Sequence, residues 1–299
     1  MDADGGGTID VGVLGPVRLS VAGRPLPMPA VKMRYLTAAL ALSAGRPWSA
    51  DRLTTALWNG TPPASARKNL HQYVHRLRAL LAADGVADRL VRQPTGYVLR
   101  MRRSELDLDR FEDLAAAGRR ARDRGDLLAA ADSLAAALAL WRDDALADVR
   151  SSLALDEAGQ TLAESRMRAV EERIAVDLCL GRHDLLVPEL ASLVTAYPLR
   201  ERLREFQMLA LYASGRRADA LAVYQDCRLV LARDLGIGPG PGLGELLSAV
   251  LADDETVLSA RLTPRSGPPS HVIRRPCAVA PAAPQPPAAV ADVPRMYLQ

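Results

Sequence analysis

The sequence predicts an α+β domain followed by an all-α domain, and three observations support this division. Short stretches near the N-terminus and around residues 90–101 alternate apolar and polar residues, as β-strands do. From residue 104 to about residue 252 the apolar residues follow a helical period without interruption. The charge changes sign at the same boundary: residues 1–100 carry 13 Lys/Arg and 6 Asp/Glu, whereas residues 101–254 carry 20 and 27.

The first domain is expected to span residues 9–101 and to contain strands, three helices and a hairpin. Strands are predicted at about 9–13 and 17–21, separated by a Gly-Pro turn. Helices are expected at about 31–43, at 50–58 with Ser49 as N-cap, and at 65–83. Two β-like runs, 90–93 and 97–101, flank Pro94-Thr95-Gly96. This order of elements is typical of a winged helix-turn-helix.

The second domain, residues 104–252, shows repeated glycine turns between amphipathic stretches. Gly181 and Gly215 are 34 residues apart, which is the period of a tetratricopeptide helix pair, whereas Gly125 and Gly181 are 56 apart. A stack of antiparallel helical hairpins, an all-α tetratricopeptide-like repeat domain, is therefore expected. The glycine-rich run 236–244 is predicted to be a linker between helices. Residues 255–299 hold nine Pro and eight Ala and are predicted to be disordered.

The third predicted helix has one apolar side and one cationic side. At 100° per residue, Leu70, Val74 and Leu77 lie in an apolar stripe that must pack inward, and no Asp or Glu occurs between residues 65 and 83. An exposed helix face with cations and no acids suits the major groove of DNA, with the following hairpin as a wing on the flanking backbone. The residues expected to contact DNA are Arg67, Lys68, Asn69, Gln72, His75, Arg76 and Arg78 on the helix, and Arg92 and Thr95 in the hairpin.

Catalysis, a bound cofactor and a metal site are not expected from the sequence. His71 and His75 are spaced like a metal-binding pair, but they lack the intervening Glu and third ligand of a zinc protease motif. The cysteines at 179, 227 and 277 have no metal-ligand spacing. No apolar run approaches the roughly 18 residues of a membrane span, and the start of the chain does not look like a signal peptide. A cytoplasmic, nucleoid-associated protein without a membrane partner is expected.

Motifs in both domains resemble a known family. The matching motifs in the first domain are the runs at 49–53, 57–58, 62–67, 73–74, 76–78 and 96–97. Those in the second are the runs at 140–142, 177–178, 180–183, 198–201 and 235–241, and Ala220-Leu221 before Tyr224. With these motifs the first domain is similar to the OmpR-type winged helix of Streptomyces antibiotic regulatory proteins (SARPs), and the second is similar to the bacterial transcriptional activator domain of that family.

The resemblance implies an activator of a biosynthetic gene cluster for a secondary metabolite. Family members bind direct repeats near promoters, so self-association on double-stranded DNA, as a dimer, is expected. They also contact RNA polymerase holoenzyme, and the loop 59–65 and the exposed face of the helical domain are the candidates for that contact. Longer members carry a nucleotide-binding domain after the activator domain; with a Pro/Ala-rich run at that place, this chain is expected to be a short-form member.

Two other interpretations compete with this one. A phosphorylation-gated response regulator would need a receiver domain before the first strand, and the strand predicted at Ile9 leaves no room for it. A helical-repeat ligand sensor or scaffold, in which the winged helix has lost DNA binding, remains an alternative. A DNA-binding assay discriminates it from an activator.

Overall fold

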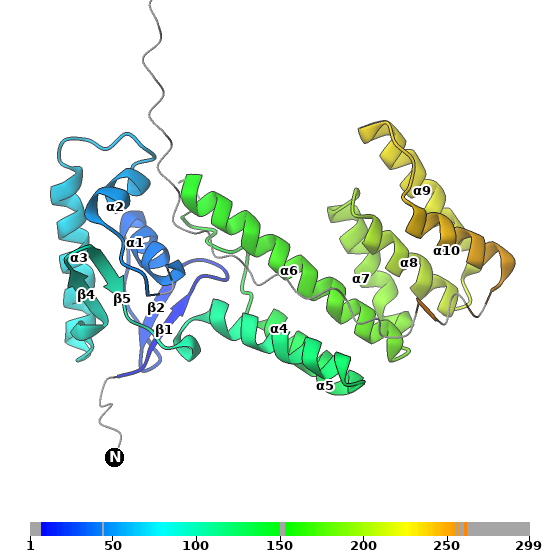
Figure 1. Ribbon diagram of the computed structural model, residues 1–299, viewed down its shortest axis with the longest axis horizontal. Coiled ribbons are helices and arrows are strands. Elements are labelled where there is room, and N and C mark those ends of the chain that lie inside the picture. Colours follow the sequence, from blue (N-terminus) through cyan, green and yellow to red (C-terminus); the bar gives the residue numbers. More distant parts are fainter. Residues whose placement is uncertain (1–6, 44, 150–152, 255, 257–259, 262–299) are drawn as a thin grey trace, which may run out of the picture.

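The computed structural model describes residues 7–43, 45–149, 153–254, 256 and 260–261. In its N-terminal part, three antiparallel strands form one sheet in the order β1 (Ile9–Gly12), β2 (Arg18–Val21) and β3 (Arg24–Pro25). Three helices follow, α1 (Val31–Leu42), α2 (Ala50–Leu57) and α3 (Ala66–Ala83) (Figure 1). The short helix η1 (Ala87–Arg89) leads into a hairpin of β4 (Leu90–Gln93) and β5 (Gly96–Leu99). This is the expected order of elements.

Local sequence explains where these elements begin. Ile9 and Val11 alternate along β1 and are fully buried, as the period of two predicts. Ser49 precedes α2, and its hydroxyl accepts a hydrogen bond from the backbone N–H of Arg52 at 3.2 Å, so the predicted N-cap is confirmed. Helix α1 is apolar on almost every side, because it lies in the centre of the N-terminal domain.

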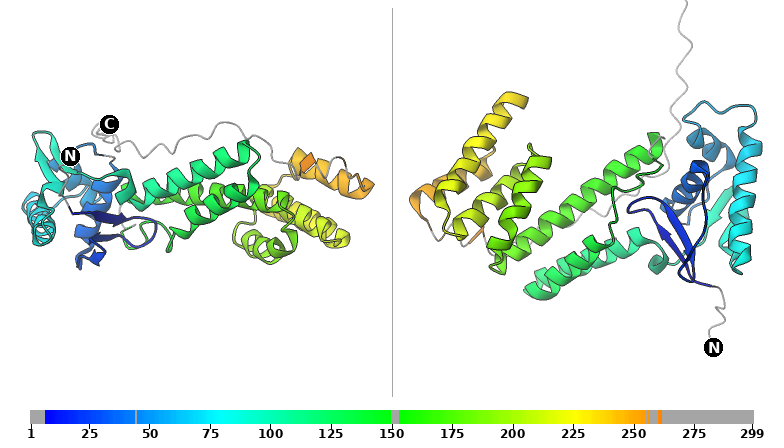
Figure 2. Two further views of the ribbon diagram at one scale, coloured as in Figure 1. Left: turned by 90° about the horizontal axis from the view of Figure 1, so that it is seen from below. Right: turned by 180° about the vertical axis from the view of Figure 1, so that it is seen from behind.

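The rest of the described chain is helical. After the short helix η2 (Arg103–Glu105) come α4 (Asp107–Asp123), α5 (Leu127–Ala139), α6 (Leu153–Cys179), α7 (His183–Ala196), α8 (Glu201–Ala213), α9 (Arg217–Leu235) and α10 (Pro241–Ala252). Successive helices pack against one another and extend away from the N-terminal sheet, with the long α6 connecting the two ends (Figures 1 and 2). The predicted stack of helical hairpins is confirmed.

The three predicted glycine turns lie between consecutive helices. Gly125 separates α4 from α5, Gly181 separates α6 from α7, and Gly215 separates α8 from α9. The residue after each glycine donates its backbone N–H to the carbonyl five residues earlier, at 2.8–3.0 Å. This is the bond of a Schellman motif, which satisfies the last carbonyls of a helix.

The predicted linker at 236–244 is shorter than expected. Helix α10 begins at Pro241, so Gly242 and Gly244 are helical and only 236–240 connects α9 to α10. Proline at the first helical position has no N–H to lose and a suitable φ, which favours this start. The carboxylate of Glu201 accepts a hydrogen bond from the Gly240 N–H at 2.6 Å and anchors the connection to α8.

Buried apolar side chains in the described residues form two clusters. The first runs from the N-terminal sheet and α1–α3 through Leu106, Phe111 and Leu134 to one side of α6. The second joins the other side of α6 to α7–α10. The two sequence domains therefore share one core at their boundary.

None of the described helices has the length and apolar character needed to span a membrane. The disorder predicted for residues 255–299 stays a prediction, because these residues lie almost wholly outside the described ones.

Candidate DNA-binding surface

Helix α3 lies at the outer edge of the N-terminal domain and is held there by its apolar stripe (Figure 1). Leu70, Val74, Leu77 and Leu81 are each exposed by 4% or less, and α3 packs against α1 and α2. Burying four such side chains contributes roughly 1.5–3 kcal/mol each. The predicted inward face of the helix is therefore confirmed, and its opposite face is left toward solvent.

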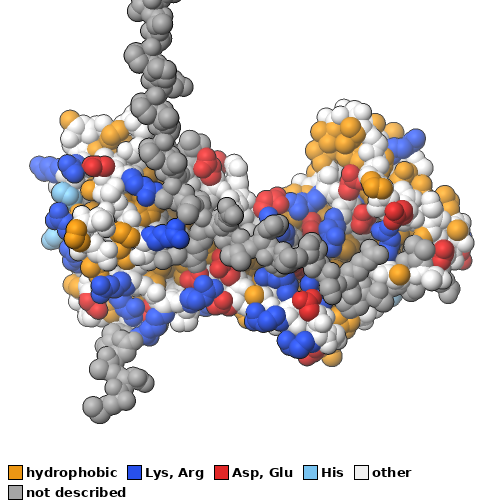
Figure 3. Space-filling model, viewed as in Figure 1, with side chains coloured by type: hydrophobic (Ala, Val, Ile, Leu, Met, Phe, Trp, Pro, Cys, Tyr) orange, Lys and Arg blue, Asp and Glu red, His pale blue; other side chains and the backbone are white. Residues whose placement is uncertain are grey.

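The exposed face of α3 carries cations, amides and imidazoles. In Figure 3, Lys/Arg and His side chains gather along the edge of the molecule over α3. The side chains there that make no hydrogen bond or ion pair to another described residue are those of Lys68, His71, Gln72, His75 and Arg76. All five residues are exposed. Since these side chains have no partner among the described residues, their polar groups are available to a ligand.

Three other candidate residues on α3 have partners. Arg67 pairs with Asp51 of α2 at 3.3 Å, but both side chains are largely exposed, so the pair is weak. Asn69 donates to the Ser65 hydroxyl at 3.3 Å. These two contacts are exposed and local, and a charged ligand can replace them.

Arg78 is different, because it supports the structure of the surface. Its guanidinium donates to the carbonyl of Leu90 through Nε at 3.3 Å and through a terminal nitrogen at 3.0 Å. This carbonyl lies at the start of β4, so Arg78 fixes the distance between α3 and the hairpin. The sequence periodicity could not reveal this contact, since it depends on where the hairpin returns to the helix.

The hairpin β4–β5 lies next to α3, with Arg92 on β4 and Thr95 at its tip, both exposed. Two backbone hydrogen bonds between Trp48 and Tyr97, at 3.0 and 2.8 Å, join β5 to the segment before α2. The contact is so close that a Cβ at Gly96, whose φ is +149°, would lie 1.9 Å from the Trp48 carbonyl oxygen. Only glycine fits there. This contact explains why the family motif at 96–97 begins with glycine, which the sequence pattern alone does not show.

The connection between α2 and α3 is exposed at every residue from 59 to 65. Its first end is held by Lys32 of α1, whose ammonium donates to the Leu57 carbonyl at 2.6 Å and lies 4.2 Å from the centre of the Trp58 ring. Partial burial lowers the pKa of Lys32. A donor at the end of α2 satisfies a terminal carbonyl and fixes where the loop begins.

A buried ion pair that sequence reasoning missed stabilises the base of the hairpin. Arg89, just before β4, makes two hydrogen bonds to the Glu105 carboxylate, at 3.1 and 3.2 Å, and its guanidinium also donates to the Gly7 carbonyl. The two side chains are 11% and 1% exposed. Nothing in the spacing of the two residues signals this pair, because the chain folds back between them.

The two histidines of α3 have no further metal-ligating side chain grouped with them among the described residues. Within the described part of the chain, no three His, Cys, Asp or Glu side chains are grouped so that they could hold a metal ion. His71 and His75 both face solvent on α3. The arrangement can bind and position a polyanion, since it consists of unpaired donors on a rigid helix.

Comparison with known proteins agrees with the sequence resemblance. Residues 106–251 match the bacterial transcriptional activator domain (BTAD) family. The chain is 45% identical to the regulatory protein AfsR of Streptomyces coelicolor over 249 residues, which cover 83% of this chain and 25% of AfsR. It is 36% identical to the regulatory protein DnrI of Streptomyces peucetius, covering 82% of this chain and 93% of DnrI. It thus spans about a quarter of AfsR but nearly all of DnrI.

A solved structure has a similar fold. The transcriptional regulatory protein EmbR of Mycobacterium tuberculosis, in complex with a low-affinity phosphopeptide, superposes with a TM-score of 0.81 at 34% identity, covering 86% of this chain and 69% of that one. In sequence, the chain matches 63% of the length of EmbR. These relatives are named as regulatory proteins and not as enzymes. The chain belongs to the Streptomyces antibiotic regulatory protein family of transcription regulators.

Proposed function

We propose that the N-terminal domain is an OmpR-type winged helix-turn-helix that binds promoter DNA, with α3 in the major groove and the β4–β5 hairpin as the wing. The observation that carries this proposal is the exposed face of α3, which presents unpaired donors and contains no acidic residue. A duplex offers phosphates along both sides of the groove and acceptors on the base edges. The name of EmbR as a transcriptional regulatory protein supports the same function.

The roles of individual residues follow from their place on α3. Lys68, Gln72 and Arg76 lie on the exposed face and address base edges, together with Asn69 once it leaves Ser65. The candidates for phosphate contacts are Arg67 and His75 on α3, and Arg92 and Thr95 in the wing. Arg78 is assigned to holding the wing, because its guanidinium is already bonded to Leu90.

The family membership extends the proposal to the whole chain. The protein binds direct repeats near a promoter, self-associates there as a dimer, and recruits RNA polymerase holoenzyme to a biosynthetic gene cluster. The fully exposed loop 59–65 supports a polymerase contact, since Lys32 fixes where the loop begins and every residue of it faces solvent. The acidic helical domain, which would repel phosphates, is suited to protein contacts.

A binding titration with matched variants tests the DNA interface. Gln72→Ala and Arg76→Ala should each weaken specific binding by about 1–3 kcal/mol. Gln225→Ala and Arg228→Ala make the same chemical changes at exposed positions of α9 and should leave binding unchanged. Fluorescence anisotropy on a labelled promoter fragment at fixed salt gives the affinities.

The salt dependence separates the two kinds of contact. Arg67→Ala should weaken binding to every sequence alike and reduce the slope of log affinity against log salt by about one. Equal affinities for wild type, Gln72→Ala and Arg76→Ala would refute the role of α3. If the wild-type chain shows no DNA binding at any promoter repeat, the helical-repeat scaffold or sensor becomes the better interpretation.

A further inference from the structure

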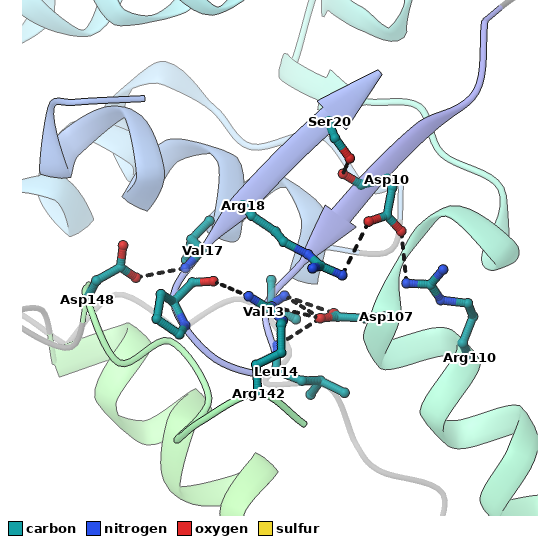
Figure 4. Close-up of polar contacts among 11 residues, drawn as sticks. Asp10, Val13, Leu14, Val17, Arg18, Ser20, Asp107, Arg110, Arg142 and Asp148 are labelled. Atoms are coloured by element: carbon teal, nitrogen blue, oxygen red, sulfur yellow. Dashed lines mark hydrogen bonds and ion pairs between the residues drawn. The ribbon is translucent and has the colours of Figure 1, made fainter. Parts of the chain in front are cut away.

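The loop between β1 and β2, residues 13–17, is buried at every position except the exposed Pro16, although it connects two strands at the edge of a domain. Val13 and Leu14 are fully buried and Val17 is 5% exposed. Loops usually run over the surface, because buried backbone groups need partners. The partners here come from the helical domain, and Figure 4 shows them around the loop.

The segment that connects α5 to α6 supplies backbone partners for this loop. We call residues 140–149 the connecting segment. Its Arg142 N–H donates to the Leu14 carbonyl at 2.9 Å, and its Leu146 N–H lies 3.0 Å from the carbonyls of both Val13 and Gly15. Leu146 is fully buried and has a φ of +57°, a conformation that costs a β-carbon residue about 1–2 kcal/mol. Strain of this kind persists where surrounding contacts determine the backbone.

Charged side chains complete the contact between the loop and the helical domain. The buried Asp107 carboxylate, at the start of α4, accepts hydrogen bonds from the N–H groups of Val13 and Leu14 at 2.8–3.1 Å. The Arg142 guanidinium bridges this carboxylate, at 3.1 Å, and the Pro16 carbonyl, at 2.9 Å. Burial raises the pKa of Asp107, and these donors oppose the rise.

Asp148 makes a second bridge at the other end of the connecting segment. One of its carboxylate oxygens accepts the Val17 N–H at 2.8 Å, and the other pairs with Arg34 of α1 at 2.6 Å. It therefore joins the helical domain to both the sheet and the central helix of the N-terminal domain. On the far side of the sheet, Asp10 of β1 pairs with Arg110 of α4 at 2.8 Å (Figure 4).

We infer that the connecting segment locks the N-terminal domain and the helical domain into one rigid body, and that Arg142 and Asp148 are positioning residues that set the direction in which the helical domain projects from bound DNA. The continuous core across the boundary agrees with this. The functional part of the inference rests on the proposed DNA binding. With α3 fixed in a groove, a rigid joint gives neighbouring protomers on tandem repeats one relative orientation, which cooperative contact requires.

The rigidity can be measured without DNA. Fluorophores attached through noncanonical amino acids at exposed positions 88 and 185 report the distance between the domains in the full chain. The wild type should give one narrow distribution of transfer efficiency. Arg142→Ala combined with Asp148→Ala should broaden or shift it. The control is Arg228→Ala combined with Asp143→Ala, which removes one positive and one negative charge as the test variant does. Arg228 lies on α9, and the Asp143 carboxylate in the connecting segment accepts only the N–H of the neighbouring Asp144 among the described residues. The control should give the wild-type distribution.

A second variant protects the test against unfolding. Should the double variant lose its helical circular dichroism, Arg142→Lys replaces it, because a single ammonium keeps the charge but cannot bridge Asp107 and the Pro16 carbonyl as the guanidinium does. The Lys variant should give the same broadening, only smaller. A distribution identical to that of wild type in a folded variant overturns the positioning role.

DNA binding gives the functional readout. The double variant should bind a single repeat with wild-type affinity, since neither residue lies on α3 or the wing, yet lose about tenfold or more of its cooperativity on two repeats. A merely destabilised protein would lose affinity for both targets. Unchanged cooperativity overturns the inference. Failure of the wild type to bind DNA rejects the proposed function instead, and the distance measurement still decides whether the joint is rigid.

Discussion

Gly96→Ala tests whether the hairpin depends on its close contact with the segment before α2. The added methyl would lie 1.9 Å from the Trp48 carbonyl oxygen and 2.7 Å from the Ser49 nitrogen. Backbone cannot move aside cheaply, so the two Trp48–Tyr97 hydrogen bonds should break. Each is worth about 1 kcal/mol, and the strained φ costs about 1–3 kcal/mol. The free energy of unfolding should fall by roughly 3–5 kcal/mol.

Gly60→Ala is the matched control for this variant. Gly60 also has a positive φ, +82°, but no atom lies within 4 Å of the position where its Cβ would be. It should lose only the conformational cost of about 1–2 kcal/mol. Urea unfolding followed by tryptophan fluorescence measures both variants, since Trp48 itself reports on the contact. Equal losses for Gly96→Ala and Gly60→Ala would refute the argument that the close approach fastens the wing.

Three further substitutions test side chains to which the structure gives a supporting role. Arg78→Ala should destabilise the chain by about 1–2 kcal/mol, because the Leu90 carbonyl loses a charged donor; a loss of DNA affinity without any change in the melting temperature would contradict this role. Lys32→Met should lower the free energy of unfolding by about 1–2 kcal/mol through the lost contacts with the Leu57 carbonyl and the Trp58 ring. In a transcription assay it should reduce activation by a larger factor than it reduces DNA affinity. Arg89→Met leaves a buried carboxylate unpaired and should cost about 3–5 kcal/mol, measured by urea unfolding; a cost below 1 kcal/mol would show that water reaches the site.

Features fixed by local spacing could be predicted from the sequence, and features fixed by distant contacts could not. The apolar stripe of α3 and the cap at Ser49 follow from residues within one or two turns, and the structure has both. The outward face of α3 follows from the same stripe. The partner of Arg78 depends on where the hairpin returns, so the sequence alone places this residue among the expected DNA contacts and does not reveal its bond to Leu90.

The boundary between the two parts shows the same limit more clearly. Composition and charge separate residues 1–100 from 101–254, and nothing in either segment alone indicates that Asp107 or Asp148 binds the β1–β2 loop. A carboxylate that accepts backbone N–H groups more than ninety positions away leaves no periodic signal. The sequence therefore shows where the composition changes, while the shared core shows that the two parts are not independent.

A fragment that ends at residue 103 should consequently fail to fold stably, although the sequence boundary suggests cutting there. It lacks Glu105, which leaves Arg89 buried without its partner at a cost of about 3–5 kcal/mol. It also uncovers Val13 and Leu14, each worth roughly 1.5–3 kcal/mol when buried. Together these losses are as large as the 5–15 kcal/mol that typically holds a domain folded.

A fragment that ends at residue 180 keeps α4, α5, the connecting segment and α6, and with them the whole first core. It should unfold cooperatively on heating, whereas the 103-residue fragment should show a shallow, featureless transition by circular dichroism. Weak DNA binding by the shorter fragment would then report its loss of structure and not the absence of a second protomer. A cooperative transition of the shorter fragment at the midpoint of the longer one would show that the N-terminal domain is stable alone, and that the contacts of Asp107 and Asp148 orient it without stabilising it.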